Sequence, residues 1–409
     1  MQNSVAFHIM TKPTGSLCNM NCTYCFYLEK GKLYPQTKQW GMNDRVLESY
    51  IRQYIKAQKV EQITFAWQGG EPTLLGVEYF DKIVNLQKQY AGSKKIGNTF
   101  QTNGVLIDEK WSEFFAKNDF LVGISIDGPE EIHDKYRIMK GGQPSFKKVL
   151  KGINHLKKYK VEFNTLTCVS KTNEDEPLKV YNFLKEIGSG YIQFIPIVER
   201  LAQDPLGNEL KLISPSYTKS ASITEYSVDP LKYGKFLSSV FDEWVRKDVG
   251  RYFVQIFDVA LEAWFGLKPN LCVFSEICGN AMAIEHNGDL YSCDHFVYPE
   301  NKLGNILNDL LQTMVESGKQ MKFGLDKKMK LTDYCKKCDY LFACNGECPK
   351  HRFIKTPDDE EGLNYLCKGY KYFFNHIDEA MSFMVYELQN RRPPKNVMKW
   401  LKKKSLITA

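Results

Sequence analysis

The stretch Cys18-Asn-Met-Asn-Cys22-Thr-Tyr24-Cys25 places three cysteines on one short segment. Three thiolates can bind three irons of a cubane cluster and leave the fourth iron open, and an open position distinguishes a reactive metal site from a closed structural one. Tetrahedral thiolate sites favour zinc or iron–sulfur. A structural zinc would need a fourth ligand, and His8 is the only histidine nearby. The spacing therefore indicates an iron–sulfur cluster, with zinc or a metal-free group of buried thiols as alternatives.

The rest of the first half alternates between strand-like and helix-like segments. Segments rich in β-branched and aromatic residues predict strands at 5–10, 62–67, 98–101, 121–126, 163–169 and 191–197. Apolar residues at helical spacing predict helices at 44–59, 77–90, 146–159 and 176–187. Six strands alternating with helices predict an α/β fold with a parallel sheet, either open or curled into a barrel.

Short polar motifs follow the first four of these strands. They are the cysteine segment, Gly69-Gly70-Glu71-Pro72, Gln101-Thr102-Asn103-Gly104 and Asp127-Gly128-Pro129. Since the carboxyl ends of parallel strands meet at one edge of a sheet, these motifs are expected to surround a single site.

The segment Cys-x3-Cys-x-Tyr-Cys resembles the signature of the radical S-adenosylmethionine superfamily. The resemblance implies a partial (β/α)6 barrel and a [4Fe-4S] cluster held by Cys18, Cys22 and Cys25. It also implies that the open iron binds S-adenosylmethionine, which is cleaved by one electron to give a radical that abstracts hydrogen. In such enzymes the cofactor carries the difficult chemistry, and the protein positions it and excludes water.

The same resemblance implies the residues that bind S-adenosylmethionine. Gly70, in the GGEP motif, would approach the methionine amino group, and Ser125 would contact the ribose. Arg137 would pair with the methionine carboxylate, a use suited to a planar bidentate donor. Tyr24 would pack at the adenine. The alternatives are a strand-end hydroxyl for Ser125, and for Arg137 a surface ion pair with one of three acids, Glu130, Glu131 or Asp134.

A second group of eight cysteines lies between residues 272 and 367. Its spacing resembles the SPASM domain, which implies two further [4Fe-4S] clusters, each fully ligated and suited to electron transfer. The resemblance implies a crossed assignment, with Cys272, Cys278, Cys293 and Cys348 on one cluster and Cys335, Cys338, Cys344 and Cys367 on the other. Spacing alone would make residues 335–348 one local four-thiolate site. Two zinc sites are the alternative, and Cys168 is expected to be a buried core residue.

Motifs along nearly the whole chain resemble the anaerobic sulfatase-maturating enzymes. Such enzymes oxidise a cysteine or serine in a sulfatase precursor, within a Cys/Ser-x-Pro/Ala-x-Arg motif, to Cα-formylglycine (3-oxoalanine). Asp294, which directly follows Cys293, resembles the family's proton acceptor, and a turn carboxylate is the alternative. Gln68 and Gln101 lie at strand ends and are expected to orient the substrate peptide, or else to satisfy loop groups. The electron donor would be a reduced ferredoxin or flavodoxin.

Two other functions are considered. The first is a SPASM-type maturase that cross-links or modifies a ribosomally made peptide. Many of these carry a leader-binding domain, and the residues before Cys18 are expected to be too few for one. The second is a non-catalytic, ferredoxin-like electron carrier, which would explain the cysteines but not GGEP, Arg137 or the barrel.

Composition narrows the remaining choices. The 409 residues, 43% of them hydrophobic, can bury a large core. Seven Lys and Arg with no acid in residues 391–409 account for the net charge of +7, so no nucleic-acid surface is expected and the tail is interpreted as a solvated helix. The sequence shows neither a membrane span nor a secretory signal, so we expect a cytoplasmic protein. The expected domains are a barrel at 1–232, a SPASM domain at 233–370 and a C-terminal helix with a basic tail at 371–409.

Overall fold

The computed structural model describes residues 6–35, 40–202, 212–214, 217 and 220–407. Val5, the first residue of the strand predicted at 5–10, lies outside these ranges.

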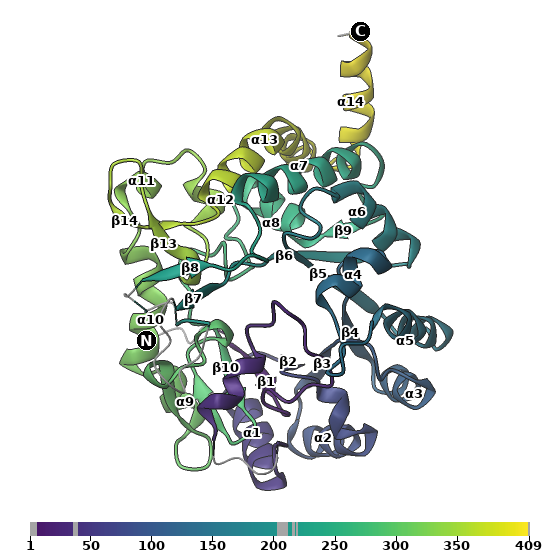
Figure 1. Ribbon diagram of the computed structural model, residues 1–409, viewed down its shortest axis with the longest axis vertical. Helices are drawn as coiled ribbons and strands as arrows, with labels where there is room; N and C mark the ends of the chain where they lie inside the picture. Colours follow the sequence, from purple (N-terminus) through teal and green to yellow (C-terminus); the bar gives the residue numbers. More distant parts are fainter. Residues whose placement is uncertain (1–5, 36–39, 203–211, 215–216, 218–219, 408–409) are drawn as a thin grey trace.

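Six parallel strands form the centre of the fold (Figure 1). They are β1 (His8–Lys12), β2 (Gln62–Trp67), β3 (Lys95–Thr102), β4 (Phe120–Ser125), β5 (Phe163–Val169) and β6 (Tyr191–Pro196). They lie side by side in chain order, and each neighbouring pair is parallel. The predicted α/β fold is therefore confirmed, as a partial barrel that does not close.

Helices connect these strands. They are α1 (Asp44–Ala57), α2 (Val77–Tyr90), α3 (Glu109–Lys117), α4 (Glu130–Tyr136), α5 (Phe146–Lys158) and α6 (Pro177–Glu186). The sequence analysis did not identify α3 and α4, which are the shortest of the six. The start of α3 carries a standard cap, because the Asp108 carboxylate accepts a hydrogen bond from the Trp111 N–H at 2.9 Å.

The second half of the chain extends the same sheet at both edges. Strand β9 (Phe253–Val254) pairs with β6, and β10 (Ala281–Glu285) pairs in parallel with β1. Beyond β10 come β11 (Asp289–Tyr291) and β12 (Lys302–Asn305), both antiparallel. The sheet thus continues across residue 233, which stays a predicted domain boundary. Strand β10 lies within the segment that carries the second cysteine group, and β1 directly precedes the first cysteine group. The pairing of β10 with β1 therefore brings the two cysteine-bearing segments to the same part of the sheet.

Helices α7 (Pro230–Lys247), α8 (Gln255–Trp264) and α13 (Cys367–Gln389) pack together near the β6 and β9 edge of the sheet, and α8 contacts both strands (Figure 1). Helix α14 (Asn396–Ile407) packs on α7 and α13 and projects outward from them. The C-terminal helix, expected from residue 371, begins earlier, at Cys367. The basic tail forms α14, whose Trp400 ring stacks on Phe383 with centroids 4.6 Å apart.

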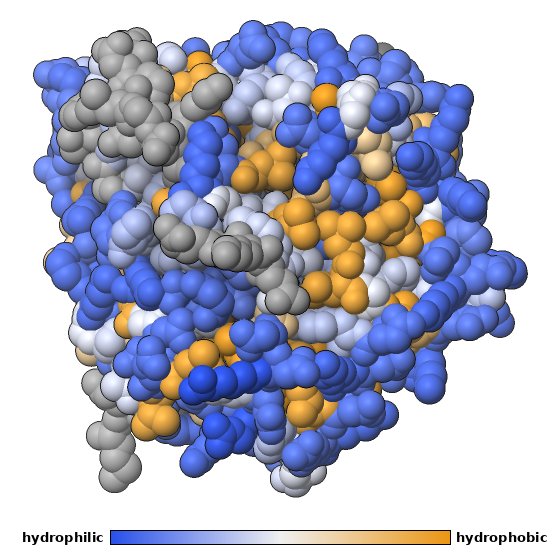
Figure 2. Space-filling model, turned by 60° about the horizontal axis from the view of Figure 1, so that its bottom comes forward, coloured by the Kyte–Doolittle hydropathy of each residue, from blue (hydrophilic) through white to orange (hydrophobic). Residues whose placement is uncertain are grey.

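The surface is largely hydrophilic where Figure 2 draws it, and apolar side chains gather in one area of that face. Exposed apolar areas are candidate contact surfaces for other polypeptides. Among the described residues, no helix has both the length and the apolar character needed to cross a membrane.

Candidate functional site

The loop after β1 carries Cys18, Cys22 and Cys25 and is anchored to the segment after α4. The Asn21 N–H donates to the Ile138 carbonyl at 2.8 Å, and the Thr23 N–H donates to the Tyr136 carbonyl at 3.0 Å. Burial raises the pKa of Cys18 to about 11 and that of Cys22 to about 12, and the nearby thiols add to both shifts. Buried thiols with raised pKa values ionise readily only when a positively charged metal group compensates them.

This donor set fits an iron–sulfur cluster better than a single ion. Within the described part of the chain, no three His, Cys, Asp or Glu side chains converge closely enough to hold one metal ion. A cubane cluster spreads its thiolate ligands over several irons, so its ligands need not converge on one point.

The GGEP motif packs directly on the cysteine loop. The Gly70 N–H donates to the Gly15 carbonyl at 2.8 Å, and the Glu71 N–H donates to the Leu17 carbonyl at 2.8 Å. A Cβ placed on Gly70 would overlap the carbonyl oxygen of Leu17. Glycine is therefore needed here for close approach of two backbones. The predicted contact of Gly70 with the methionine amino group stays a prediction.

We expect Gly70→Ala to destabilise the cluster-loaded enzyme by about 1–3 kcal/mol, because the added methyl group must displace the cysteine loop. The measurement is chemical unfolding of the loaded protein, together with its iron content. Gly190→Ala is the matched control, since a Cβ there would meet no atom within 4 Å. Equal stability of the two variants would contradict this account of Gly70.

Glu71 connects the GGEP and QTNG motifs, a role that the sequence analysis missed. Its carboxylate is fully buried and accepts hydrogen bonds from the Thr73 N–H at 3.0 Å, the Thr102 hydroxyl at 2.8 Å and the Asn103 N–H at 2.8 Å. The Asn103 amide in turn donates to Asn19 at 2.8 Å and lies 3.7 Å from the Cys18 sulfur. The two motifs and the cysteine loop thus form one connected unit.

Arg137 lies in a buried cluster with Tyr24 and Asp127. Its Nη1 donates to the Tyr24 hydroxyl at 2.8 Å and lies 3.9 Å from an Asp127 oxygen, and Tyr24 donates to Asp127. Arg137 is 6% exposed, and its Nε has no hydrogen-bond partner among the described residues. A buried guanidinium with an unused donor fits an anionic ligand such as the S-adenosylmethionine carboxylate.

The alternative ion pairs proposed for Arg137 are wrong. Glu130 pairs with Lys147 and Glu131 with Lys179. Asp134 accepts hydrogen bonds from the backbone N–H groups of Ser145 and Phe146.

The cluster around Arg137 also includes Asp127 and lies against Cys168. Asp127 was visible only as part of the DGP motif, and it also accepts from the Cys168 N–H at 3.1 Å. Cys168 is buried, as expected, and packs with Tyr24, Ile197 and Tyr226. The Tyr24 hydroxyl is engaged by Arg137 and Asp127, and its contact with adenine stays a prediction.

Ser125 and Gln101 contact each other at the carboxyl ends of β4 and β3. The Gln101 Nε2 donates to the Ser125 hydroxyl at 3.0 Å. Gln68 follows β2, and its backbone N–H donates to the Thr11 carbonyl at 2.9 Å. These residues lie at the predicted edge of the sheet, and their roles toward the ribose and the peptide stay predictions.

The mutual influence of the eight later thiols supports the crossed arrangement, which stays a prediction. Burial and the neighbouring Cys348 and Cys272 thiols raise the pKa of Cys293, and Cys272 also raises the pKa of Cys278. The other four influence one another in the same way: Cys344 is affected by Cys367 and Cys335, and Cys367 by Cys335 and Cys338. Cys348 is thus near Cys293, although it lies only four residues after Cys344 in the chain.

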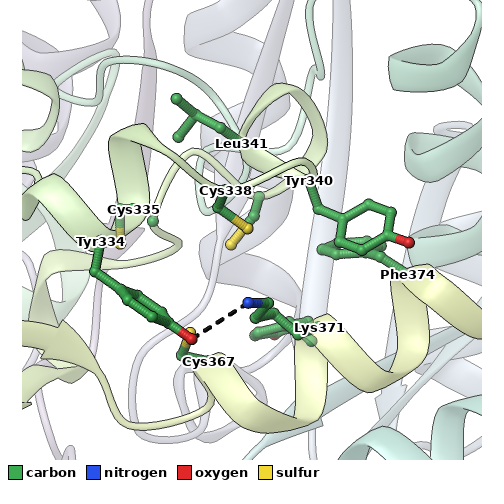
Figure 3. Close-up of a pocket in the computed structure, with 11 residues that line it drawn as sticks. Tyr334, Cys335, Cys338, Tyr340, Leu341, Cys367, Lys371 and Phe374 are labelled. Carbon is green, nitrogen blue, oxygen red and sulfur yellow. Dashed lines mark hydrogen bonds between the residues drawn. The ribbon is translucent and has the colours of Figure 1, made fainter. Parts of the chain in front are cut away.

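The second of these sets surrounds a cavity (Figure 3). Cys335, Cys338, Cys344 and Cys367 line it together with apolar and aromatic side chains, among them Tyr340, Leu341 and Phe374. Lys371 donates to the Tyr334 hydroxyl at 3.2 Å at its edge. Four thiols around an apolar cavity fit a fully ligated iron–sulfur cluster.

Asp294 lies between the two halves of the site. It is 9% exposed and forms an ion pair with Lys12, the last residue of β1. Lys12 Nζ also lies 4.3 Å from the centre of the Tyr27 ring. Burial acts to raise the pKa of Asp294, but Lys12, together with His295 and Lys350, outweighs it and holds that pKa below its ordinary value. Asp294 is therefore an ionised carboxylate at the barrel mouth, directly beside Cys293, and Lys12 is a neighbour that the sequence analysis missed.

Comparison with known families agrees with this geometry. Residues 13–184 match the model of the Radical SAM superfamily, and residues 272–339 match the SPASM model, described as an iron–sulfur cluster-binding domain. The fold and the three groups of thiols thus define a radical S-adenosylmethionine enzyme with a SPASM domain. Three [4Fe-4S] clusters and S-adenosylmethionine are its cofactors, and the thiol groups described above fit them.

Individual relatives define the family. The chain is 49% identical, over 98% of its length and 96% of the relative, to a serine-type anaerobic sulfatase-maturating enzyme of Bacteroides thetaiotaomicron. It is 36% identical, over 90% of its length and 95% of the relative, to a cysteine-type enzyme of Clostridium perfringens. A solved structure of anSMEcpe with bound AdoMet and the Kp18Cys peptide superposes with a TM-score of 0.81 and 34% identity, covering 94% of this chain and 100% of that one. The chain belongs to the family of anaerobic sulfatase-maturating enzymes.

Proposed function

We propose that this chain oxidises a cysteine or serine of a sulfatase precursor to Cα-formylglycine and thereby activates the sulfatase. The observation that carries the proposal is the position of Asp294, a buried carboxylate at the barrel mouth that directly follows an auxiliary thiol. Family membership supports it, and neither a cross-linking maturase nor a non-catalytic electron carrier explains it as well.

The proposed division of labour follows from the geometry. When bound, the cofactors supply one-electron cleavage of S-adenosylmethionine, hydrogen-atom abstraction at the substrate Cβ and acceptance of the remaining electron. Asp294 takes the proton of the substrate hydroxyl or thiol, a step that needs a base within hydrogen-bond reach. Arg137, Ser125, Gly70 and Tyr24 hold S-adenosylmethionine, and Gln68 and Gln101 orient the peptide backbone.

Serine-type and cysteine-type relatives both resemble the chain, so the test must offer both substrates. Serine-type relatives are 49% and 32% identical to it, and a cysteine-type relative is 36% identical. Identity alone therefore does not sort the two types.

The test uses synthetic peptides with the Ser-x-Pro-x-Arg or Cys-x-Pro-x-Arg motif and the reduced, cluster-loaded enzyme. We expect a mass change corresponding to formylglycine, which from serine is the loss of two hydrogen atoms. Formation of 5′-deoxyadenosine without change in either peptide would refute the proposed substrate. A serine-to-alanine peptide is the control and should keep its mass.

Two further assignments are part of the proposal. The electron donor is a reduced ferredoxin or flavodoxin. The exposed Lys336, Lys337 and Lys368, which are sequence neighbours of the cavity-lining Cys335, Cys338 and Cys367, are suited to an acidic carrier. The protein works in the cytoplasm, which is supported by twelve cysteines that are all free. We also retain the proposed domain boundaries after residues 232 and 370.

A further inference from the structure

Lys30 is a buried lysine whose amino group lacks a hydrogen-bond partner. It lies in the 3-10 helix Leu28–Leu33, just after the cysteine loop, and is 2% exposed. Its Nζ lies 3.2 Å from the centre of the Tyr298 ring and has no hydrogen-bond partner among the residues that the structure describes. Lysine is almost never fully buried without a partner, and each such group needs an explanation.

The proposed base is one of the charged groups that act on Lys30. The charged groups that act on it are Lys350, Glu199, Asp294 and Glu300. Burial and Lys350 lower the pKa of Lys30 to about 7, against the opposing effect of the three carboxylates. The Tyr298 ring that covers the Lys30 amino group lies only four residues after Asp294 in the chain, so Lys30 and the proposed base lie in the same region of the site.

A second unpaired polar atom lies in the same region. The His295 ring stacks parallel to Phe26 with centroids 5.2 Å apart, and its Nδ1 also has no hydrogen-bond partner among the described residues. Lys350 lies over the same Phe26 ring at 4.9 Å and pairs with Glu199. Aromatic rings and unpaired polar atoms beside a proposed base are the features of a site that a polar ligand completes.

We infer that Lys30 is a substrate-positioning residue, and that its Nζ donates a hydrogen bond to a backbone carbonyl of the sulfatase segment held at Asp294. This inference rests on the proposed function. The Tyr298 ring covers one side of the Lys30 amino group. An ammonium has three N–H donors, and the ring replaces only part of the hydrogen bonding that water would give them. A backbone carbonyl is the acceptor that every peptide offers, so this contact sets the register of the substrate without selecting a side chain.

The test compares Lys30→Met with Lys32→Met. Methionine keeps an unbranched chain against Tyr298 and removes the donor. Lys32 lies on the same 3-10 helix, but 45% of its side chain is exposed. Binding of a labelled sulfatase peptide, with alanine at the reacting position, is measured on cluster-loaded enzyme with S-adenosylmethionine. We expect Lys30→Met to raise the Kd roughly tenfold or more and Lys32→Met to leave it unchanged.

A second measurement separates positioning from folding. Replacing one backbone amide of the peptide by an ester weakens its carbonyl as an acceptor. When the ester replaces the amide whose carbonyl contacts Lys30, it should weaken peptide binding to the wild-type enzyme but not to Lys30→Met. A lysine with a purely structural role would not make the effect of the ester depend on Lys30 in this way. If Lys30→Met does not fold, Lys30→Gln replaces it in the same comparison of amide and ester peptides.

The outcomes separate the two proposals. An unchanged Kd for Lys30→Met, with or without a lower melting temperature, would overturn the role of Lys30. Weaker binding combined with ester coupling at one position would support it. A wild-type enzyme that neither binds nor oxidises the peptide would instead overturn the proposed function. Cleavage of S-adenosylmethionine without peptide should be the same in all variants.

Discussion

Cys18→Ala is expected to reduce cleavage of S-adenosylmethionine to the level of buffer alone while the two auxiliary clusters remain loaded. Cys18 is one of only three thiols on the loop after β1, so its loss leaves too few thiolates for a stable cluster with one open iron. Cys18 is not among the groups that shift the pKa of Cys293 or Cys344, so we expect the two auxiliary clusters to assemble without it. The measurements are 5′-deoxyadenosine by chromatography and iron content per chain.

Cys168→Ala is the matched control for this prediction. Cys168 is a buried thiol on β5 that belongs to none of the three predicted thiol groups. We expect it to keep its iron and its cleavage activity. Cleavage by Cys18→Ala at the wild-type rate would show that the reactive cluster is not on this loop, and a loss of most iron would show that the three groups assemble together.

The order of the barrel strands was predictable from the sequence because parallel strands alternate with helices and carry local patterns. The edge of the sheet at which the motifs meet was also predictable, because functional residues lie at the carboxyl ends of parallel strands. Helix α4, with seven residues, carries too short a pattern to be recognised. The pairing of β1 with β10 joins segments more than 250 residues apart, and no local signal marks it.

The candidate site shows the same division between local and distant information. Cysteine spacing and short motifs indicated which residues matter, but not what they contact. The ion pair of Lys12 with Asp294, the hydrogen bond of Arg137 to Tyr24 and the binding of residues 102–103 by Glu71 all join distant segments. Such contacts depend on side-chain geometry, and spacing along a single sequence does not contain it.

Asp294→Asn is expected to keep S-adenosylmethionine cleavage and to lower formylglycine formation by roughly 10²–10⁴-fold, the usual contribution of a general base. Asparagine has nearly the shape of aspartate but accepts no proton from the substrate. Both products are measured in one reaction, 5′-deoxyadenosine by chromatography and formylglycine by mass. Asp289→Asn is the matched control, because Asp289 is also buried and pairs with a lysine, Lys302, at 2.6 Å.

The ion pair with Lys12 requires one more variant. Removing the charge of Asp294 leaves Lys12 buried without its partner, which can cost about 3–5 kcal/mol of stability. The double variant Lys12→Met with Asp294→Asn removes both charges and is expected to recover that stability. If the double variant is stable, loaded with clusters and active in cleavage but still makes no formylglycine, the missing function is proton acceptance. If it makes the product at the wild-type rate, Asp294 serves only to pair with Lys12, and the base must be sought elsewhere in the site.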